Sequence, residues 1–328
     1  MDGPLIKSRG TELSRHDEKA ICVSVVIVSD YEEGDANWTS ERACVGAFLA
    51  DDPGVPMDVI VMRPLPDGAA SRDLPVDFAG LAPKVSVRFE PCRNSAALKD
   101  AALKYTKGEL VAVVEADCLP EPGWLKHLIA AMRDDPALDV VSGRTLYGTD
   151  TAMLRVMTLI DRGFIEQRID GEYVEVSNNG ALYRRNILEA HQYPDESSPF
   201  VSAELRGRRM REGGVRIGFE PRAAMRHAFG GISFLADLRR NKGYQTARRL
   251  IQDSQRFVGA SAAWIALHSV AQSARADAMA VRCAGKNYVR RIDWPLLAIM
   301  FLAVRLPEFL GALSVRRPER FAAMTKYR

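Results

Sequence analysis

The amino-acid sequence predicts an α/β protein with a mostly parallel sheet and helices on both faces. Two observations lead to this prediction. Apolar, β-branched runs occur at Val23–Val28, Met57–Met62 and Leu110–Val114, and such runs are typical of strands buried on both faces. Segments of helical character separate these runs along the chain. Alternating strands and helices form parallel sheets covered by helices, and ligands bind beyond the carboxyl ends of the strands.

The expected elements follow one another regularly in the first half of the chain and less regularly in the second. A stripe from Met153 through Val156, Met157 and Ile160 to Phe164 predicts a further helix. Its ordinary role is core packing, and a lid or a membrane-facing helix is the alternative. In chain order we expect a helix over 38–50, strands over 57–62 and 85–89 separated by a loop over 63–83, a helix over 95–105, a strand over 110–114, a helix over 123–132, a strand over 138–141, a helix over 199–212, a short strand over 215–219 and a basic helix over 234–250.

The composition restricts the class of protein. The chain has 328 residues, 47% of them hydrophobic, and a net charge of +3. This is enough for a large globular domain with extensions, and the small charge argues against a nucleic-acid partner. The five cysteines form no CxxC pair, which indicates reduced thiols in a cytoplasmic protein without a zinc site. Residues 1–20 are polar and lack the apolar core of a signal peptide, so we expect a flexible N-terminal tail.

The C-terminal part combines basic residues with an apolar segment over 294–313. Residues 294–304 carry no charge, but Arg305, Pro307 and Glu308 interrupt the segment. Because a spanning helix needs about 20 apolar residues, a full span is not expected. One interpretation is an interfacial helix at an anionic membrane surface; the other is packing against the globular domain or a partner. The basic residues of 239–249 are interpreted either as contacts to phosphates or such a membrane, or as a solvated helix face.

The most informative segment is Gly108–Asp117, an apolar strand that ends on Glu115 and Asp117. Alternation along a strand places these two carboxylates on the same side. Hard oxygen ligands suit Mg²⁺ or Mn²⁺, and these ions usually hold substrate phosphates. The alternative is an acidic strand end without a function. The chain has neither a GxxxxGKS/T loop nor a GxGxxG after the first strand, so it lacks the P-loop and dinucleotide fingerprints.

Several segments, in the same order along the chain, resemble the inverting family 2 glycosyltransferases, which have the GT-A fold. The resemblance implies a GT-A-like, Rossmann-related domain over 21–253 and a helical C-terminal extension over 254–328. The opening strand matches at Ser24–Ile27, and the helix and turn before the site match at Lys99–Asp100 and Gly108–Glu109. The DxD-like signature matches at Glu115–Asp117 with Pro120, Pro122, Trp124 and Leu125, and the acceptor side matches at Ser177–Arg185. The last matching segment, similar to the family's EDxxLxxR…G…P…H pattern, comprises Glu204–Leu205, Arg208, Gly213–Gly214, Pro221 and His227.

The resemblance implies that the domain binds a nucleotide-sugar donor through Mg²⁺ or Mn²⁺. Asp117 would be the direct metal ligand, with Glu115 nearer the ribose or a metal-bound water. His227 resembles a histidine that adds a metal contact, and a surface or core histidine is the alternative. Lys99 would offset the charge of the diphosphate, and Tyr31 is the candidate for stacking on the base. Trp124 is expected to be a packing residue.

Two departures from the family pattern concern the catalytic base and the recognition of the nucleotide base. The aspartate that normally serves as catalytic base falls on Ser202. Glu204 is therefore the candidate base, with Asp195 or Glu196 as substitutes, and a surface Glu204 paired with Arg208 is the alternative. After Val61, where the family usually has an aspartate that reads the nucleotide base, the chain has Met62-Arg63-Pro64, with Asp67 the nearest carboxylate.

The expected activity is metal-dependent, inverting transfer of one sugar to a glycan or lipid-linked acceptor, as in polysaccharide biosynthesis. The QxxRW motif of polymerising synthases is missing, and Arg239–Tyr244 occupies the comparable region. We expect a cytoplasmic protein, peripheral at the inner face of the membrane. One alternative is a catalytically degenerate domain that binds nucleotide-sugar or serves as a scaffold. A nucleotidyltransferase is a further alternative, but the segment Tyr31–Asp35 is acidic where such enzymes usually carry a basic loop.

Overall fold

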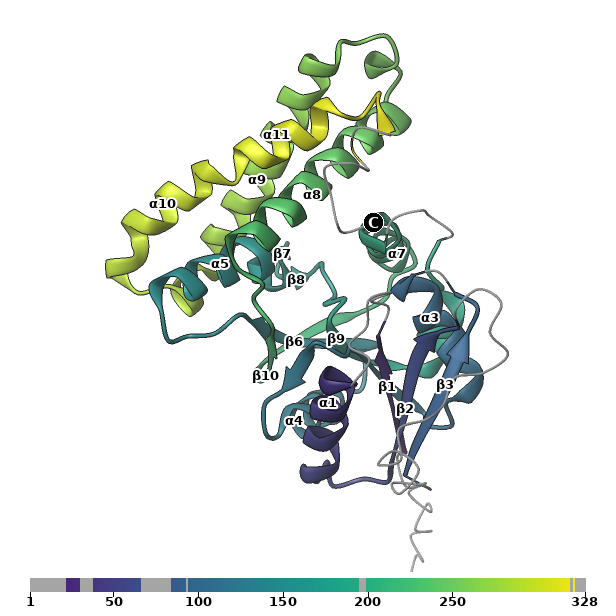
Figure 1. Cartoon of the computed structure of the whole chain (residues 1–328). Coiled ribbons are helices and arrows are strands. Elements are labelled where there is room, and N and C mark those ends of the chain that lie inside the picture. The colour runs from purple at the N-terminus through teal and green to yellow at the C-terminus, as the bar shows by residue number, and fades with distance from the viewer. Residues whose placement is uncertain are drawn as a thin grey trace, which may run out of the picture.

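The computed structural model describes residues 22–29, 38–65, 84–92, 94–194, 199–318 and 321. The predictions for the tail over 1–20, for Tyr31, for Asp67 and for Asp195 and Glu196 fall outside these residues. Figure 1 shows a sheet with helices on both sides and, next to it, a layer of long helices from the C-terminal part of the chain.

One eight-stranded sheet forms the centre of the fold, with the order β3-β2-β1-β4-β9-β6-β10-β5. Four of its seven strand pairings are parallel, and the antiparallel ones all involve β9 or β5. The predicted mostly parallel sheet is therefore confirmed, with a mixed second half. The strands are β1 (Val23–Val28), β2 (Met57–Pro64), β3 (Val85–Glu90), β4 (Leu110–Glu115), β5 (Cys118–Pro120), β6 (Val140–Leu146), β9 (Gly180–Arg184) and β10 (Ile217–His227), and a separate hairpin joins β7 (Arg168–Ile169) to β8 (Glu172–Tyr173).

Two strands run further than their apolar pattern predicts. β10 continues past Pro221 to His227, because an irregularity in its register with β6 between Phe219 and Ala224 accommodates the proline. β6 continues through Ser142 and Gly143, whose polar and small side chains hid the strand in the sequence. Any Cβ on Gly143 would lie 1.9 Å from the Ala223 carbonyl oxygen, so the close approach of β10 requires glycine there.

Helices cover both faces of the sheet, as predicted. On one face, α1 (Thr39–Ala50) and α4 (Trp124–Asp134) bury Phe48 and Trp124, whose ring centroids are 5.9 Å apart. Trp124 thus has the packing role expected of it. The other face is covered by α3 (Ser95–Ala101), α6 (Arg185–Ala190) and α7 (Pro199–Glu212).

The C-terminal helices pack on one another and on α5 (Ala152–Arg162). Val156, Met157 and Ile160 of α5 are buried in one cluster with residues of α9 and α10, which confirms the core-packing interpretation of that stripe. The domain boundary that we expect after residue 253 stays a prediction. α8, which ends at that boundary, packs closely against α9 and α11, which follow it. The helices are α8 (Gly231–Asp253), α9 (Ala262–Tyr288), α10 (Trp294–Ala303) and α11 (Arg305–Leu313).

Residues 291–313 are, by length and composition, apolar enough to cross a membrane, and no other helix in the described part of the chain is. An 18-residue window within them has a mean hydropathy of 1.9, and 28% of that window is buried. The expectation that Arg305 and Glu308 interrupt it too strongly is not supported by this criterion. In the fold the two charges pair with each other at 2.8 Å, and their side chains are only 13% and 0% exposed, so neither faces outward.

Candidate active site

The carboxylates predicted from the sequence lie at the carboxyl end of β4, in the middle of the sheet. β4 ends at Glu115, next to Val28 of β1, and a tight turn leads through Asp117 into β5. Because β5 pairs antiparallel with the end of β10, His227 lies opposite Cys118 and beside Asp117. Potential ligand atoms of Glu115, Asp117, Cys118 and His227 all lie within 4.8 Å of one another.

Glu115 is held by three side chains at this edge. Its Oε1 accepts hydrogen bonds from Lys99 Nζ at 2.8 Å and Asn178 Nδ2 at 3.3 Å. Its Oε2 accepts a hydrogen bond from Asn179 Nδ2. Lys99, only 3% exposed, also donates to the Asn178 carbonyl oxygen at 2.8 Å. Both oxygens of Glu115 are thus engaged, which leaves Asp117 as the better direct metal ligand of the two.

The protonation of His227 fits a cation between its ring and Asp117. Nδ1 lies 2.7 Å from the Ala228 carbonyl oxygen, which can only accept, so Nδ1 carries the proton. Burial, together with the nearby charge of Arg162, lowers the pKa of His227, and the ring is neutral at pH 7. The lone pair of Nε2 therefore faces Asp117 Oδ2 at 3.3 Å. Two acceptors at this distance are stabilised by a cation that both can bind, so the pair fits a divalent metal.

Cys118 does not fit as a ligand of a hard metal. Its Sγ lies 3.6 Å from Asp117 Oδ1, and burial raises the pKa of the thiol well above its usual value. The thiol is therefore protonated and serves as a weak donor to Asp117. This leaves Asp117 and His227, the residues named for a metal from the sequence, as the candidate ligands, and their role stays a prediction.

Aromatic side chains enclose the imidazole of His227. Tyr147 meets it edge-on with ring centroids 5.6 Å apart, and Phe234 of α8 lies at 6.3 Å. Phe229 packs on Tyr147 with ring centroids 5.0 Å apart. These rings explain why His227 is only 6% exposed. They also keep water from that side of the site.

Glu204, the candidate catalytic base, lies on the surface of α7. Its side chain is 51% exposed and forms an ion pair with Arg249 of α8. The alternative pairing with Arg208 is wrong, because α8 packs close enough to α7 to supply Arg249, while Arg208 lies 3.9 Å from Asp253. Glu204 is not among the acidic groups gathered around Asp117 in the described part of the chain.

The two family departures noted in the sequence correspond to buried side chains. Ser202 is 1% exposed and donates its hydroxyl hydrogen to the Pro194 carbonyl oxygen at 3.0 Å. Arg63 of β2, in the region of the missing base-reading aspartate, lies 4.2 Å over the Trp38 ring, and its Nε is 3.4 Å from Glu41 Oε1. A buried ion pair between β2 and α1 therefore occupies the position after Met62.

Sequence reasoning missed three residues that contact the predicted site. Asn178 and Asn179 were noted only as part of the acceptor-side segment, although two adjacent amides before a glycine were a usable signal. That glycine leaves room for a neighbouring side chain, since a Cβ on Gly180 would lie 2.2 Å from Met225 Sδ. Arg162, whose Nη1 donates to Asn179 Oδ1 at 2.8 Å, had no sequence signal at all.

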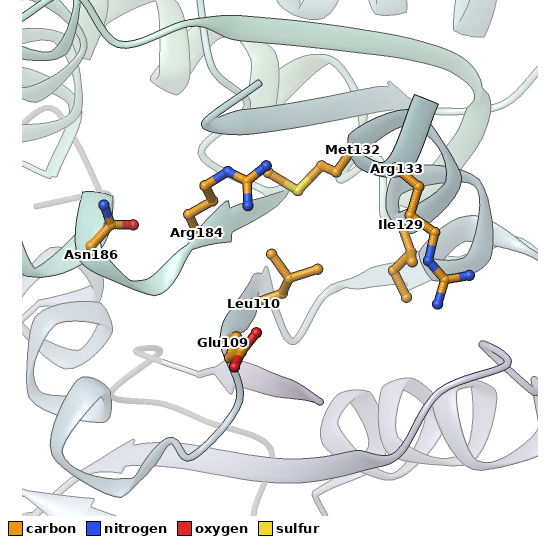
Figure 2. A pocket seen from close by; sticks show the side chains of 7 residues that line it. All are labelled: Glu109, Leu110, Ile129, Met132, Arg133, Arg184 and Asn186. Atoms are coloured by element: carbon orange, nitrogen blue, oxygen red, sulfur yellow. The ribbon is translucent and has the colours of Figure 1, made fainter. Parts of the chain in front are cut away.

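A separate pocket of about 250 Å³ lies away from the carboxylates (Figure 2). Glu109 and Leu110 stand where β4 begins, whereas Glu115 ends it, so the pocket is at the opposite edge of the sheet. Arg184 in its wall already donates to the carbonyl oxygens of Leu138 and Pro136. The lining residues are Glu109, Leu110, Ile129, Met132, Arg133, Arg184 and Asn186.

The sheet and its covering helices define the class of fold, which is GT-A-like. Residues 67–192 match the family model described as Glycosyl transferase family 2. This match covers less than half of the chain and supports the resemblance to the family 2 glycosyltransferases noted in the sequence. No curated protein matches its sequence.

The solved structures that are similar to this chain include the following two. The mannosyltransferase PcManGT from Pyrobaculum calidifontis, in complex with GDP-Man and Mn²⁺, is 16% identical over 90% of this chain and 87% of that chain, with a TM-score of 0.57. At this identity the likeness shows the fold alone. GalNAc-T7 with UDP, GalNAc and Mn²⁺ is 12% identical over 65% of this chain and 45% of that chain, and its TM-score of 0.48 is too low to support an argument.

Proposed function

We propose that the protein is a metal-dependent, inverting glycosyltransferase that moves one hexosyl unit from a nucleotide-sugar donor to a glycan or lipid-linked acceptor. The observation that carries the proposal is the pair formed by Asp117 and the neutral His227, whose acceptor atoms face each other 3.3 Å apart next to Glu115. The PcManGT complex, which holds GDP-Man and Mn²⁺ on the same fold, supports it.

In this mechanism Asp117 and His227 would hold Mg²⁺ or Mn²⁺, which when bound neutralises diphosphate charge and stabilises the leaving group. Lys99 adds positive charge at the same edge and fixes Glu115. The reaction breaks the bond between the anomeric carbon and the diphosphate oxygen and forms a bond from that carbon to the acceptor oxygen, with inversion. The acceptor hydroxyl proton passes to a general base.

Glu204 is proposed as that general base, and the rival proposal is a catalytically degenerate, nucleotide-sugar-binding domain. The ion pair with Arg249 and the buried hydroxyl of Ser202 favour the rival, because neither side chain is a free carboxylate at the metal site. If Glu204 is the base, Glu204→Gln should abolish transfer and donor hydrolysis while nucleotide binding stays unchanged. The measurement is release of nucleoside diphosphate from a panel of nucleotide-sugars. Turnover that survives in Glu204→Gln would assign the base elsewhere, and no turnover by the wild type would favour the degenerate domain.

We further propose that the protein works at the cytoplasmic face of a membrane, through the outer side of α10 and α11. Large apolar side chains repeat along this side at helical spacing: Ile292, Ile299, Leu302, Leu306 and Leu310 are 82%, 63%, 71%, 65% and 41% exposed. Exposed arginines flank them, Arg290 and Arg291 before and Arg316 and Arg317 after. An apolar stripe between basic ends suits an anionic lipid surface.

The membrane proposal is tested by co-sedimentation of the full chain with vesicles of anionic or neutral lipid. We expect Ile299→Asn/Leu302→Asn to lose most of the bound fraction, since both side chains point away from the helical layer. Ile265→Val, at a site that is 0% exposed in α9, is the matched control and should sediment like the wild type. A full chain that stays in the supernatant with anionic vesicles at low salt would rule the proposal out.

The proposed activity itself is tested by titrating the purified protein with several nucleoside diphosphates in the presence and absence of Mn²⁺. We expect one nucleotide to bind in the micromolar range when Mn²⁺ is present, and far more weakly after chelation. Failure of every nucleotide to bind with Mn²⁺ would overturn the proposal.

A further inference from the structure

We propose that Arg162, the last residue of α5, is a positioning residue of the metal site that orients Asn179 and, through it, the carboxylate of Glu115. The inference rests on the proposed function, because it assigns Arg162 a role toward the same metal site. The first step is the chain of contacts. Arg162 Nη1 donates to Asn179 Oδ1 at 2.8 Å, and Asn179 Nδ2 donates to Glu115 Oε2.

This chain of contacts allows only one orientation of the Asn179 amide. The amide has an acceptor end and a donor end, and here a guanidinium meets the oxygen while a carboxylate meets the nitrogen. A flipped amide would turn its oxygen toward Glu115 and its NH₂ toward Arg162, so that like would face like at both ends. Arg162 therefore reinforces the orientation in which the NH₂ of Asn179 reaches Glu115.

Tyr147 in turn supports Arg162. The guanidinium carbon lies 5.4 Å from the centroid of the Tyr147 ring, a distance at which a cation is attracted to an aromatic face. The same ring meets His227 edge-on. Arg162 thus lies between Glu115 and His227. Asn179 connects it to Glu115, and Tyr147 connects it to His227.

One nitrogen of the Arg162 guanidinium opposes stability rather than adding to it. Its Nε is buried and has no hydrogen-bond partner among the residues that the structure describes, which is costly for a guanidinium. The adjacent carboxylate, Asp161, already pairs with Arg239 and accepts from the Tyr147 hydroxyl. If packing were its only role, an apolar side chain would serve better.

Arg155, on the same helix, shows the contrasting structural case and supplies a matched control. Its Nε and Nη2 donate to the two oxygens of Asp293, both at 2.8 Å, and its Nη1 donates to the Thr149 carbonyl oxygen at 2.7 Å. This bidentate pair joins α5 to the segment before α10. Arg155 makes no contact with the metal site.

The test measures Mn²⁺ affinity by electron paramagnetic resonance in the presence of the nucleoside diphosphate that binds the wild type, with unfolding by urea in parallel. We expect Arg162→Met to weaken Mn²⁺ binding by about 10- to 100-fold, as is usual when a partner outside the direct ligands of a metal site is lost; Glu115 would take part by holding a water on the metal. Arg162→Lys should recover part of this, because an ammonium can still donate to Asn179 Oδ1. Arg155→Met should lower the stability but leave the Mn²⁺ affinity unchanged.

A double-mutant cycle separates positioning through Asn179 from a general disturbance. If Arg162 acts through Asn179, adding Arg162→Met to Asn179→Ala should change Mn²⁺ affinity by less than about 3-fold, since the relay is already broken. Two outcomes would overturn this inference but leave the proposed function standing. One is a double variant in which the two losses of Mn²⁺ affinity multiply, and the other is an Arg162→Met variant that binds Mn²⁺ as tightly as the wild type. A wild-type protein that binds neither Mn²⁺ nor nucleotide would overturn the proposed function and this inference with it.

Discussion

Asp117→Ala is expected to abolish Mn²⁺-dependent nucleotide binding and to lower transfer by at least about 100-fold, because the metal's stabilisation of the leaving group amounts to several kcal/mol. His227 alone is too weak a ligand to hold the ion. The measurements are nucleotide titration with Mn²⁺ and the rate of transfer. Glu121→Ala is the control: Glu121 is a nearby carboxylate that pairs on the surface with Arg226 at 2.7 Å, and its loss should leave both quantities unchanged.

Asp117→Asn sharpens this prediction, because it separates metal binding from folding. The amide Nδ2 can donate to the lone pair of His227 Nε2, so two opposed acceptors become a hydrogen bond. Without metal, Asp117→Asn should therefore be at least as stable as the wild type, while its Mn²⁺ affinity falls as far as that of Asp117→Ala. Wild-type Mn²⁺ affinity in either variant would remove Asp117 from the metal site.

Arg239→Met is expected to lower the free energy of unfolding by about 3–5 kcal/mol, because it takes the ion-pair partner from buried Asp161 and removes one of the positive charges beside Asp277 and Glu308. Arg239 is 1% exposed, and its guanidinium donates to Asp277 and Glu308, both at 2.9 Å, and to Asp161. Lys242 and Arg305 complete a buried ionic cluster of three bases and three acids that joins α5, α8, α9 and α11.

Urea unfolding at pH 7 measures this loss, and Arg240→Met is the matched control. Arg240 is next in sequence but lies 3.7 Å from Asp237 with its side chain 32% exposed, so its loss should cost about 1 kcal/mol or less. A loss below about 1 kcal/mol in Arg239→Met would show that water reaches the cluster and solvates its carboxylates.

The cluster also sets a dependence of stability on pH. Burial raises the pKa of Asp277, but the charges of Lys242, Arg239 and Arg305 outweigh it and hold that pKa well below its usual range. A carboxyl with a lowered pKa in the folded state adds stability above its unfolded pKa and loses it as the pH falls. The stability difference between wild type and Arg239→Met should accordingly narrow as the pH drops below about 4.

Local patterns were sufficient where one strand or one turn carried the information. The β-branched runs predicted β1, β2 and β4, because the burial of a strand follows from its own residues. The tip of β4 pointed to Glu115 and Asp117, because side chains that suit a hard metal are recognised by residue type. The ordered segments predicted the family, and a family model that matches residues 67–192 supports this prediction. The extent of β6 and β10 was underestimated, because glycine, proline and buried polar residues interrupt their apolar pattern.

The arginines show where local patterns fail. Arg239 belongs to a run of basic residues for which a solvated helix face was one interpretation, and that interpretation is wrong for it, because acids from α5, α9 and α11 surround it. Arg162 had no signal in the sequence, because its partners Asn179 and Tyr147 come from other elements. Which charged side chains are buried depends on how the helices pack against one another. The helical periodicity of the sequence carries no information on that packing.

The sequence by itself determined the GT-A class, the strand that carries Glu115 and Asp117, and His227 as a candidate ligand. Only the tertiary structure decided that β5 turns back onto β10 and brings His227 within 3.3 Å of Asp117, and that Asn178, Asn179 and Lys99 engage both oxygens of Glu115. The physical reason is that a strand's residue types follow from its own burial. The neighbours of its last residues depend instead on pairings between segments far apart in the chain, which no local period records.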